Sequence, residues 1–389
     1  MTSSGTSARV ITFASGLDSK VLDQARDVAS MPFIYPHVAL MPDAHFGLGS
    51  AVGTVFGTQG AVIPAAVGVD IGCGMIGVRT QFGADDLAAR DLTRLRDRLE
   101  RVIPLSPGNY NKRVARESAD QRVRELQELA DDTGVDLSHS PKWKVQLGSL
   151  GGGNHFIELC LDEEDRVWMF LHSGSRGVGN KIAQKHIKVA RSECAGLDLP
   201  NKDVAFLTEG TATFGQYLRE LQWAQRFAWL NREEMMDRFS DELSALMGTA
   251  VVESQRINCH HNYTVQEEHY GETVWLTRKG AILAADGVPA LIPGSMGTAS
   301  YVVEGKGNAE ALRSAPHGAG RRFSRTEAKK RFTAADLDQR MEGIVYRPGK
   351  EWIDEIPDAY KDIDQVMDDA RELVTVKHKL RQVLNVKGT

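Results

Sequence analysis

The glycines of this chain are gathered into short clusters that alternate with long stretches of helical periodicity. The densest of these clusters are GVDIGCG (68–74), GSLGGGNH (148–155), HSGSRGVGN (172–180), PGSMG (293–297) and HGAGR (317–321). Because glycine has no Cβ, each cluster permits tight turns and a close approach of the backbone to a bound group. One such cluster is equally typical of an ordinary loop. Four of the five also carry a histidine or a cysteine, which favours a single site assembled from distant segments.

The stretches between the clusters predict both helices and strands. Apolar residues recur at helical intervals at 85–102 and 115–130, which predicts surface helices, and further helical regions are predicted at 211–247 and, as a helix or helix pair, at 358–383. Short strand-like runs lie close to the clusters, at 60–64, 167–171, 274–276 and 282–284. Strands near the clusters with helices outside predict an α+β fold, with central β-sheets around a buried site.

The length of the chain constrains its domain organisation only loosely. At roughly 150 residues per domain, 389 residues would make two or three domains, yet no linker rich in proline or serine divides the chain. We therefore expect a single domain over 1–389, with a largely helical segment at about 178–250. No fixed-period repeat is present, so a solenoid or propeller is not expected.

Compartment and redox state follow from the remaining composition. No apolar run approaches the roughly 18 residues that span a bilayer, and the start MTSSGTSARVITF lacks the pattern of a secretion signal, so a cytoplasmic protein is predicted. The four cysteines are scattered and form no CxxC pair, which argues against a disulfide framework. A functional cysteine here is expected to be a ligand or a nucleophile.

The charge of the chain is unevenly distributed. The formal net charge is -5, which argues against a generally basic nucleic-acid-binding surface. The segment 311–332 nevertheless holds seven basic residues and one acidic residue, a local net charge of +6. A local anion-binding site is therefore expected within an acidic protein.

The clusters contain residue types that bind transition metals. Asp70 and Cys73 lie three residues apart in VDIGCG, so one turn could direct a carboxylate and a thiolate at the same ion. His155 follows a triple glycine, and His172 ends the apolar run VWMFL. Imidazole and thiolate from separate strand ends are common in catalytic metal sites. Each histidine alone is more often a structural polar residue, but the group together predicts a metal site.

The motif INCHHN leaves one ligand undecided. In a strand, side chains alternate between the two faces, so Cys259 and His261 would share one face and His260 would lie on the other. Spacing alone does not choose between them.

Two common nucleotide motifs are missing from the sequence. It contains no GxxxxGK[ST] loop and no Lys-x-Asp-Gly, since Ala284 stands where that lysine would precede Asp286-Gly287. A nucleotide enzyme would therefore need another nucleophile. His317 in APHGAGR is the candidate, because neutral imidazole is nucleophilic near pH 7, the surrounding glycines admit a phosphate and Arg321 could bind one.

Taken in order, these motifs resemble one family. MPDAHFG, VGVDIGCGM, GSLGGGNHF, HSGSRGVG, NCHHNY, PGSMGT, HGAGR, AYKDI and the terminal NVKG resemble the RtcB family of RNA-splicing and repair ligases, in its compact bacterial form. The resemblance covers nearly the whole chain. It implies an RtcB-like fold and an enzyme that joins an RNA 3′-phosphate or 2′,3′-cyclic phosphate to a 5′-hydroxyl, with GTP and two Mn²⁺ ions, through a histidine-GMP and an RNA-ppG intermediate.

The resemblance also implies a role for each matching residue. Cys73 would bridge two metal ions, His172 and His261 would complete one of them, and Asp70 and His155 the other. His317 would accept GMP, and Asp43 and His45 would lie near the reacting ends, with Asp43 a possible base for the 5′-hydroxyl. The implied guanylate contacts are Asn154, Phe156, Glu158, Pro293, Gly294, Ser295, Tyr360 and Lys387. The implied RNA phosphate contacts are Arg176, Arg321 and Arg325.

Two other functions would use parts of the same residue set. A metal-dependent phosphodiesterase that opens cyclic phosphates without ligation would need the metal ligands but neither His317 nor the guanine contacts. A non-catalytic sensor of RNA ends or nucleotides would need the pocket but not an intact nucleophile. Because ligands, nucleophile and guanine contacts are all present in the sequence, the ligase is the favoured prediction.

Overall fold

Two β-sheets lie at the centre of the computed structural model, which describes residues 8–388. Residues 1–7, the start of the segment predicted to lack a secretion signal, and residue 389 lie outside the described part. The first sheet has, in spatial order, β1 (Arg9–Thr12), β2 (Ile34–His45), β3 (Val52–Thr58), β11 (Glu272–Lys279) and β10 (Asn262–His269). The second has β13 (Pro289–Ile292), β14 (Ser300–Gly305), β16 (Val374–Lys387), β6 (Phe156–Leu161), β7 (Arg166–Ser173), β5 (Gly74–Gly83) and β9 (Glu253–His260).

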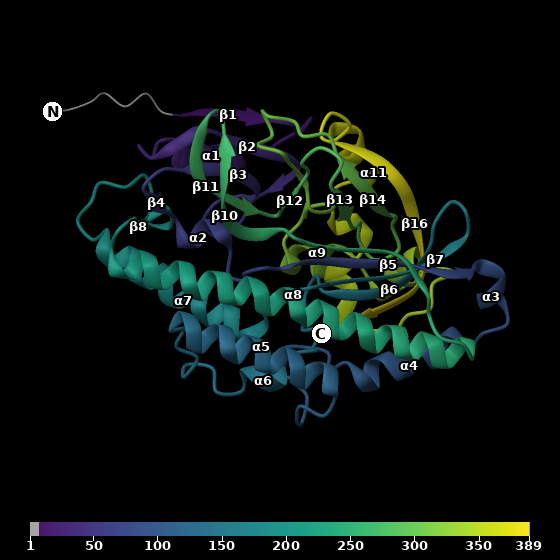
Figure 1. Cartoon of the computed structure of the whole chain (residues 1–389). Helices are drawn as coiled ribbons and strands as arrows, with labels where there is room; N and C mark the ends of the chain where they lie inside the picture. Colours follow the sequence, from purple (N-terminus) through teal and green to yellow (C-terminus); the bar gives the residue numbers. More distant parts are fainter. Residues whose placement is uncertain (1–7, 389) are drawn as a thin grey trace.

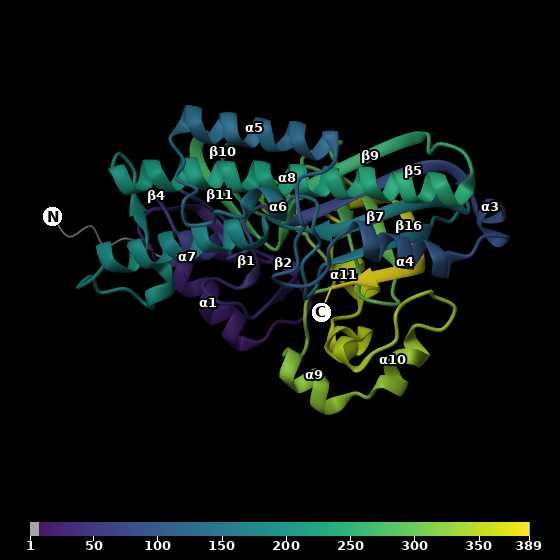
Figure 2. The same cartoon turned by 90° about the horizontal axis from the view of Figure 1, so that it is seen from below.

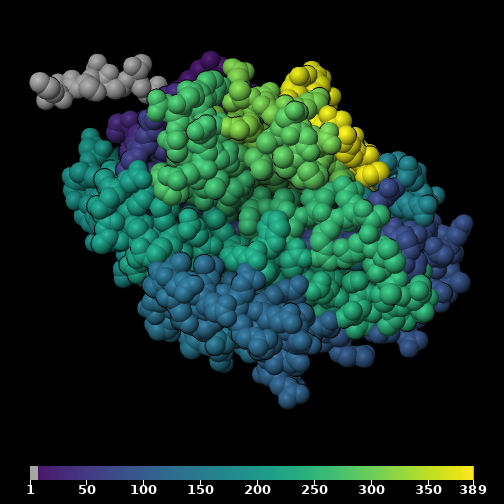
Figure 3. Space-filling model, viewed as in Figure 1, coloured from purple at the N-terminus to yellow at the C-terminus, as the bar shows by residue number. Residues whose placement is uncertain are grey.

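Both sheets combine segments that are distant in the sequence. Within the described residues β1 and β2 pair in parallel, and the other strand pairs are antiparallel. The space-filling view shows the same interleaving at the surface, where N-terminal residues lie against residues of β10 and β11 (Figure 3). Two short strand pairs complete the described β-structure: β4 (Ala61–Val62) with β8 (Leu207–Thr208), and β12 (Ala281–Leu283) with β15 (Ser314–Pro316).

The long helix α8 (Ala212–Met247) covers the seven-stranded sheet. It packs on β5 and β7, and α5 (Glu117–Thr133) lies on its outer side (Figure 1). Thr211 caps the first turn by accepting the Phe214 N–H at 3.3 Å, and Gly248 ends the helix with a φ of 77°. Its buried face carries large apolar side chains at helical spacing, including Trp223 and Phe227.

Shorter helices surround this core. Two of them also pack against α8, namely α4 (Leu92–Val102) and α7 (Arg176–Glu193). On the side opposite α5, α9 (Arg325–Arg331) and α10 (Ala334–Arg340) form a small layer with its own apolar cluster (Figure 2). The other described helical segments are α1 (Ser19–Ala29), α2 (Pro64–Val67), α3 (Ala84–Ala88), α6 (Trp143–Gln146), α11 (Ile363–Asp369), and the 3₁₀ segments η1 (Lys202–Val204), η2 (Lys350–Glu355) and η3 (Pro357–Ala359).

The predicted α+β architecture is confirmed, and so are most of the predicted elements. The helices expected at 115–130 and 211–247 are α5 and α8, the strands expected at 167–171 and 274–276 lie in β7 and β11, and the strand expected at 282–284 overlaps β12, which ends at Leu283. The segment at about 178–250 is largely helical, since α7 and α8 occupy most of it. No helix within residues 8–388 is both long enough and apolar enough to cross a lipid bilayer.

The helix or helix pair predicted over 358–383 is wrong. Only Ile363–Asp369 is α-helical there, and Val374–Lys387 is the long strand β16. The apolar residues of this segment fit helical spacing almost as well as strand spacing, so periodicity alone did not decide. Pairing decides, because β14 and β6 bond to β16 along successive parts of its length.

Two other predicted elements are shorter than expected. The helix predicted at 85–102 is divided into α3 and α4, because Asp91 accepts the Arg94 N–H at 3.2 Å and so begins a new helix. In the strand predicted at 60–64, only Ala61–Val62 pairs, since Pro64 starts α2.

Candidate active site

The predicted metal ligands meet at one end of the seven-stranded sheet. Asp70 and Cys73 precede β5, and His155 precedes β6. His172 is the penultimate residue of β7, and His261 directly follows β9. In an antiparallel sheet the start of one strand lies beside the end of its neighbour. The register confirms this arrangement, since His172 pairs with both Met75 of β5 and Phe156 of β6.

These side chains form a continuous cluster of metal-binding atoms. Cys73 Sγ lies 3.4 Å from His155 Nε2 and 3.2 Å from His172 Nε2. His172 Nε2 is in turn 2.8 Å from His261 Nε2. Asp70 Oδ2 lies 3.1 Å from His155 Nε2. Every predicted ligand therefore lies within contact distance of another.

The Nδ1 atoms of two histidines face oxygen atoms that can accept a hydrogen bond. His155 Nδ1 lies 2.9 Å from the Leu150 carbonyl and 3.1 Å from Arg176 Nη1, and His261 Nδ1 lies 3.2 Å from Asn262 Oδ1. A histidine whose Nδ1–H is bound in this way directs the Nε2 lone pair at its other neighbours, the usual arrangement around a bound metal.

Burial shifts the pKa values of several side chains in the cluster. It lowers the pKa of His172 and of His261 well below the ordinary value, so both imidazoles are neutral. Burial and the nearby Asp70 charge raise the pKa of the Cys73 thiol. Burial also raises the pKa of Asp70, but its contacts with His155 and the Arg176 charge outweigh that and lower it to about 2. Facing nitrogen lone pairs beside a carboxylate and a thiol fit a divalent cation, which would also ionise the thiol.

The structure resolves the ligand left open in INCHHN. His261 lies in the cluster, whereas His260 Nδ1 lies 2.8 Å from the Gly72 carbonyl and 3.2 Å from Arg232 Nη2. Cys259 packs against the apolar core. His261 is therefore the available ligand of the three.

Two buried polar residues of α8 support the cluster, and sequence analysis missed both. Asn231 Oδ1 accepts the N–H groups of Gly148 and Ser149, and its Nδ2 donates to the Gly174 carbonyl. Arg232 donates to the carbonyl of Gly72 and to that of Ser173. Together they hold three glycine clusters against one helix. A polar pair on the apolar face of a helix is unusual, and that pattern could have revealed them.

His317 lies beside the metal cluster but comes from a different strand pair. It follows β15, whose Pro316 pairs with Ala281 of β12, and Ala281 N–H donates to the His261 carbonyl at 3.1 Å. The rings of His261 and His317 are consequently 4.7 Å apart. Asp43, at the end of β2, places Oδ2 2.6 Å from His317 Nδ1.

The end of β2 is fitted closely to this loop. Gly320 has a φ of +71°, and a Cβ there would lie 2.3 Å from the Asp43 carbonyl oxygen. His45 Nδ1 lies 3.0 Å from the same carbonyl, and burial lowers the pKa of His45 to about 4. His45 and His317 rings stack 6.4 Å apart. Asp43 is fully buried behind His317, whereas His45 lines the cavity.

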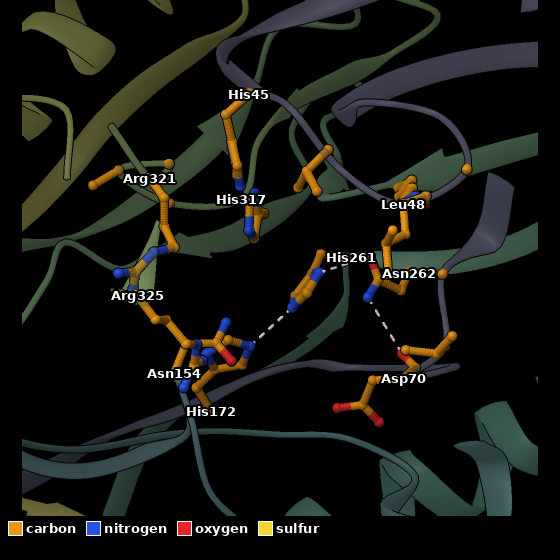
Figure 4. A pocket seen from close by; sticks show the side chains of 18 of the residues that line it. His45, Leu48, Asp70, Asn154, His172, His261, Asn262, His317, Arg321 and Arg325 are labelled. Atoms are coloured by element: carbon orange, nitrogen blue, oxygen red, sulfur yellow. Dashed lines mark hydrogen bonds between the residues drawn. The ribbon is translucent and has the colours of Figure 1, made fainter. Parts of the chain in front are cut away.

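A cavity of about 740 Å³ connects these groups. His261 and His317 lie in its middle, with Asn154, Arg321 and Arg325 on one side and Leu48, Asn262 and Asp70 on the other (Figure 4). Its volume falls within the range usual for small-molecule and cofactor sites. The cavity therefore offers two arms that meet at His317.

One arm contains all the predicted guanylate residues. Asn154, Phe156, Glu158, Pro293, Gly294, Ser295, Tyr360 and Lys387 line it. Glu158 is buried, and burial raises its pKa to about 8 despite the Lys387 charge and a hydrogen bond from Asn385. Lys387 donates to Glu355 Oε2 at 2.9 Å, and Tyr360 donates to the same oxygen at 2.7 Å. Sequence analysis missed Glu355, which no local pattern marks.

The three predicted RNA-phosphate arginines lie in different settings. Arg325 lines the cavity and is half-exposed. Arg321 also lines it, but its guanidinium donates to Glu355, Tyr360 and the Asp354 carbonyl. Arg176 is partly buried, does not line the cavity, and has Nη1 3.1 Å from His155 Nδ1. Of the three, Arg325 is the most available to a phosphate in this structure.

The other arm was not anticipated from the sequence. One face of α7 lines it with Gln184, Ile187, Lys188 and Arg191, joined by Lys202 and Lys279. Leu48, which is 82% exposed, and Val69 add apolar surface. Apolar groups beside several cations suit a nucleotide chain, because the apolar groups can contact the bases and the cations can bind the phosphates.

A buried thiol and imidazole cluster open to a nucleotide-sized cavity is characteristic of a metal-binding enzyme of nucleotide or nucleic-acid chemistry, rather than of a structural protein. Sequence comparison identifies the family. The family model described as tRNA-splicing ligase RtcB matches residues 24–388. The chain belongs to the RtcB family of RNA-splicing ligases.

Individual relatives agree with the family match. The chain is 44% identical to the RNA-splicing ligase RtcB of Escherichia coli K12, over 96% of this chain and 95% of that protein. It is 30% identical to RNA-splicing ligase RtcB2 of E. coli ATCC 25922, covering 98% and 96% of the two chains, and 29% identical to the tRNA-splicing ligase RtcB of Pyrobaculum aerophilum, covering 93% and 89%. The protein is an RNA ligase. The family match therefore supports the predicted ligase over the phosphodiesterase and the sensor. The buried cluster of Cys73, His155 and His172 indicates that it depends on a metal.

Proposed function

We propose that this RNA ligase joins an RNA 3′-phosphate, or a 2′,3′-cyclic phosphate after its hydrolysis, to a 5′-hydroxyl at the expense of GTP, and that His317 carries GMP between the two substrates. One observation supports this most directly. His317 lies at the junction of two cavity arms, beside the metal-type cluster, so a nucleotide in one arm and RNA in the other would meet at its ring.

In the first step, an imidazole nitrogen of His317 attacks the α-phosphorus of GTP, and pyrophosphate leaves. Asp43 faces Nδ1 at 2.6 Å, so Nε2 is the nitrogen free to attack. The carboxylate stabilises the charge that develops on the ring as the N–P bond forms. Glu158 would accept the N1–H and N2–H groups of guanine at the far end of the arm.

In the later steps, GMP passes from His317 to the RNA 3′-phosphate, giving an RNA-ppG end with a good leaving group. The 5′-hydroxyl then attacks the phosphorus of the RNA 3′-phosphate, and GMP leaves. Attack and departure are in line, so the 5′ strand must approach from the side opposite GMP. The arm lined by α7 and Leu48 is the candidate for that approach, since Leu48 lies across His317 from Arg321 and Arg325 (Figure 4). We propose that it receives the 5′ strand, with Arg325 holding phosphate in the other arm; Arg176 and Arg321 remain predicted phosphate contacts.

In this proposal Cys73, His172 and His261 would hold one Mn²⁺ ion, and Cys73, Asp70 and His155 would hold a second. When bound, such cations neutralise phosphate charge and polarise the reacting phosphoryl groups. Asp43 remains the predicted base for the 5′-hydroxyl.

Two further features belong to the proposal. The chain works as a single domain over 1–389, because strands from its beginning, middle and end share sheets. The cytoplasm is its proposed location, in keeping with an RNA substrate.

Incubation with α-³²P-GTP and Mn²⁺, followed by denaturing electrophoresis, tests the proposal. We expect a covalent label that acid removes, as phosphoramidates are acid-labile, and that unlabelled RNA with a 3′-phosphate discharges. An unlabelled protein that still seals RNA would exclude the histidine-GMP route.

A further inference from the structure

Two buried amides of β16 link the nucleotide-facing turn at 293–298 to the carboxylate of Glu158. They are Gln382 and Asn385, neither of which lines the cavity. Asn385 is the cross-strand neighbour of Glu158, and Gln382 is that of Cys160. Neither residue has a role in the function proposed above.

The turn determines the orientation of the Gln382 amide. Gln382 Nε2 donates to the carbonyls of Ser295 and Thr298, both at 2.9 Å, and Gln382 Oε1 accepts the Gly297 N–H at 3.1 Å. Backbone groups have fixed donor and acceptor roles, so the reverse orientation would lose these bonds. Gln382 Oε1 therefore faces Asn385 as an acceptor.

Gln382 in turn determines the orientation of Asn385. Asn385 Nδ2 lies 3.4 Å from Gln382 Oε1 and 2.8 Å from Glu158 Oε1. Gln382 Oε1 can only accept, so the NH₂ group of Asn385 faces it, and the same NH₂ group donates to Glu158 Oε1. Among the described residues Asn385 Oδ1 finds no hydrogen-bond partner, which shows that the amide is oriented for its donor end. The backbone of the turn thus fixes the orientation of Gln382, and Gln382 fixes that of Asn385, which donates to the Glu158 carboxylate.

The surroundings of Glu158 make this donor important. Its carboxylate is buried, and apart from Asn385 the groups that act on it are Lys387 of β16 and the Cys160 thiol of its own strand, whose Sγ lies 3.9 Å from Oε2. Lys387 is itself bonded to Glu355. Asn385 is therefore the close uncharged donor that favours the ionised carboxylate against burial.

The protonation state of Glu158 decides which purine it can bind. An ionised carboxylate only accepts hydrogen bonds, which matches the N1–H and N2–H donors of guanine. A protonated one can donate, which matches the N1 acceptor of adenine. We propose that Asn385 is a positioning residue for base selection: by donating to Glu158 Oε1, in an orientation set by Gln382 and the turn, it favours the ionised, purely accepting form of Glu158 and with it the binding of guanine. This proposal rests on the proposed use of GTP.

The test measures binding of GMP and AMP by calorimetry, without metal, at pH 7.0 and 8.5. In Asn385→Leu, which keeps the size but removes the donor, we expect the preference for GMP over AMP to fall about tenfold at pH 7.0, as for one lost bond to a charged group. The loss of preference for GMP should be smaller at pH 8.5, because a larger fraction of Glu158 is then ionised even without the Asn385 hydrogen bond. Asn385→Asp should lower the preference further, since two adjacent carboxyl groups retain a proton.

Three controls keep the outcomes distinct. Gln121→Leu makes the same kind of change on the exposed face of α5 and should leave both affinities unchanged. Thermal melting checks folding, and Asn385→Asp, the closest in shape, serves if the leucine variant does not fold. Equal losses for GMP and AMP at both pH values would show a merely structural role and overturn the proposal. A wild type that does not prefer GMP would instead overturn the use of GTP itself.

Discussion

Asp43 Oδ2 lies 2.6 Å from Nδ1 of His317 and also accepts the backbone N–H of that residue at 3.2 Å. The two residues are 274 positions apart in sequence. One carboxylate therefore holds both the ring and the backbone of the proposed nucleophile, and leaves the far ring nitrogen for the substrate.

His317→Ala should abolish labelling by GTP and the sealing of 3′-phosphate ends, because alanine has no nucleophilic nitrogen to accept GMP and the neighbouring His261 is a predicted metal ligand. The variant should still join a prepared RNA-ppG end, since that step follows the lost one. Denaturing gels of both reactions provide the measurement. Sealing of ordinary 3′-phosphate ends by the variant would contradict the role of His317.

Asp43→Asn should slow guanylylation by about 100-fold, the usual scale for losing a group that assists proton or charge transfer. The amide keeps the size of the side chain but cannot stabilise a charged imidazole. Single-turnover labelling with GTP measures the effect, and Asp120→Asn on the exposed surface of α5 is the matched control. An unchanged rate in Asp43→Asn would mean that the close contact only supports the loop.

Cys73→Ser should lower the affinity for Mn²⁺ at least tenfold and remove most ligation. A hydroxyl is rarely deprotonated and bridges two cations poorly, whereas a metal ionises a thiol readily. Calorimetric titration of the chelator-treated protein with Mn²⁺ gives the affinity directly. Cys194→Ser, at a buried thiol far from the cluster in the fold, tests whether any thiol loss has this effect. Full manganese binding by Cys73→Ser would remove Cys73 from the ligand set.

Asn231→Leu should destabilise the protein by about 3 kcal/mol, because it leaves several buried backbone groups of the glycine clusters without partners. Urea unfolding measures this loss. Metal affinity should fall in the same variant, since those clusters carry His155 and His172. Asn109→Leu, on an exposed loop, should change neither quantity. Lost stability with intact metal binding would show that Asn231 supports the fold but not the site.

The sequence indicated the chemistry of the candidate site more clearly than the elements that carry it. Four of the five predicted metal ligands and His317 lie in glycine clusters whose composition is itself unusual, so their chemistry was visible locally, whereas His261 lies in INCHHN, which contains no glycine. The strand β16 was not predicted, because its apolar spacing also suits a helix and its pairing with β6 involves residues more than 200 positions away. That error concealed Gln382 and Asn385, which were predicted to lie in or beside a helix.

Local chemistry, then, was determined by the sequence alone: a thiol, a carboxylate and imidazoles beside glycine, and a histidine in a basic segment. The tertiary structure decided between His260 and His261, oriented the rings through the Leu150 carbonyl and Asn262, placed Arg176 behind the cluster and opened a second arm along α7. It also brought Asn231, Glu355 and Asn385 to their partners. The physical reason is the same throughout. The chemistry of a side chain limits which bonds it can form, but only the packing of distant segments determines which of those bonds are made.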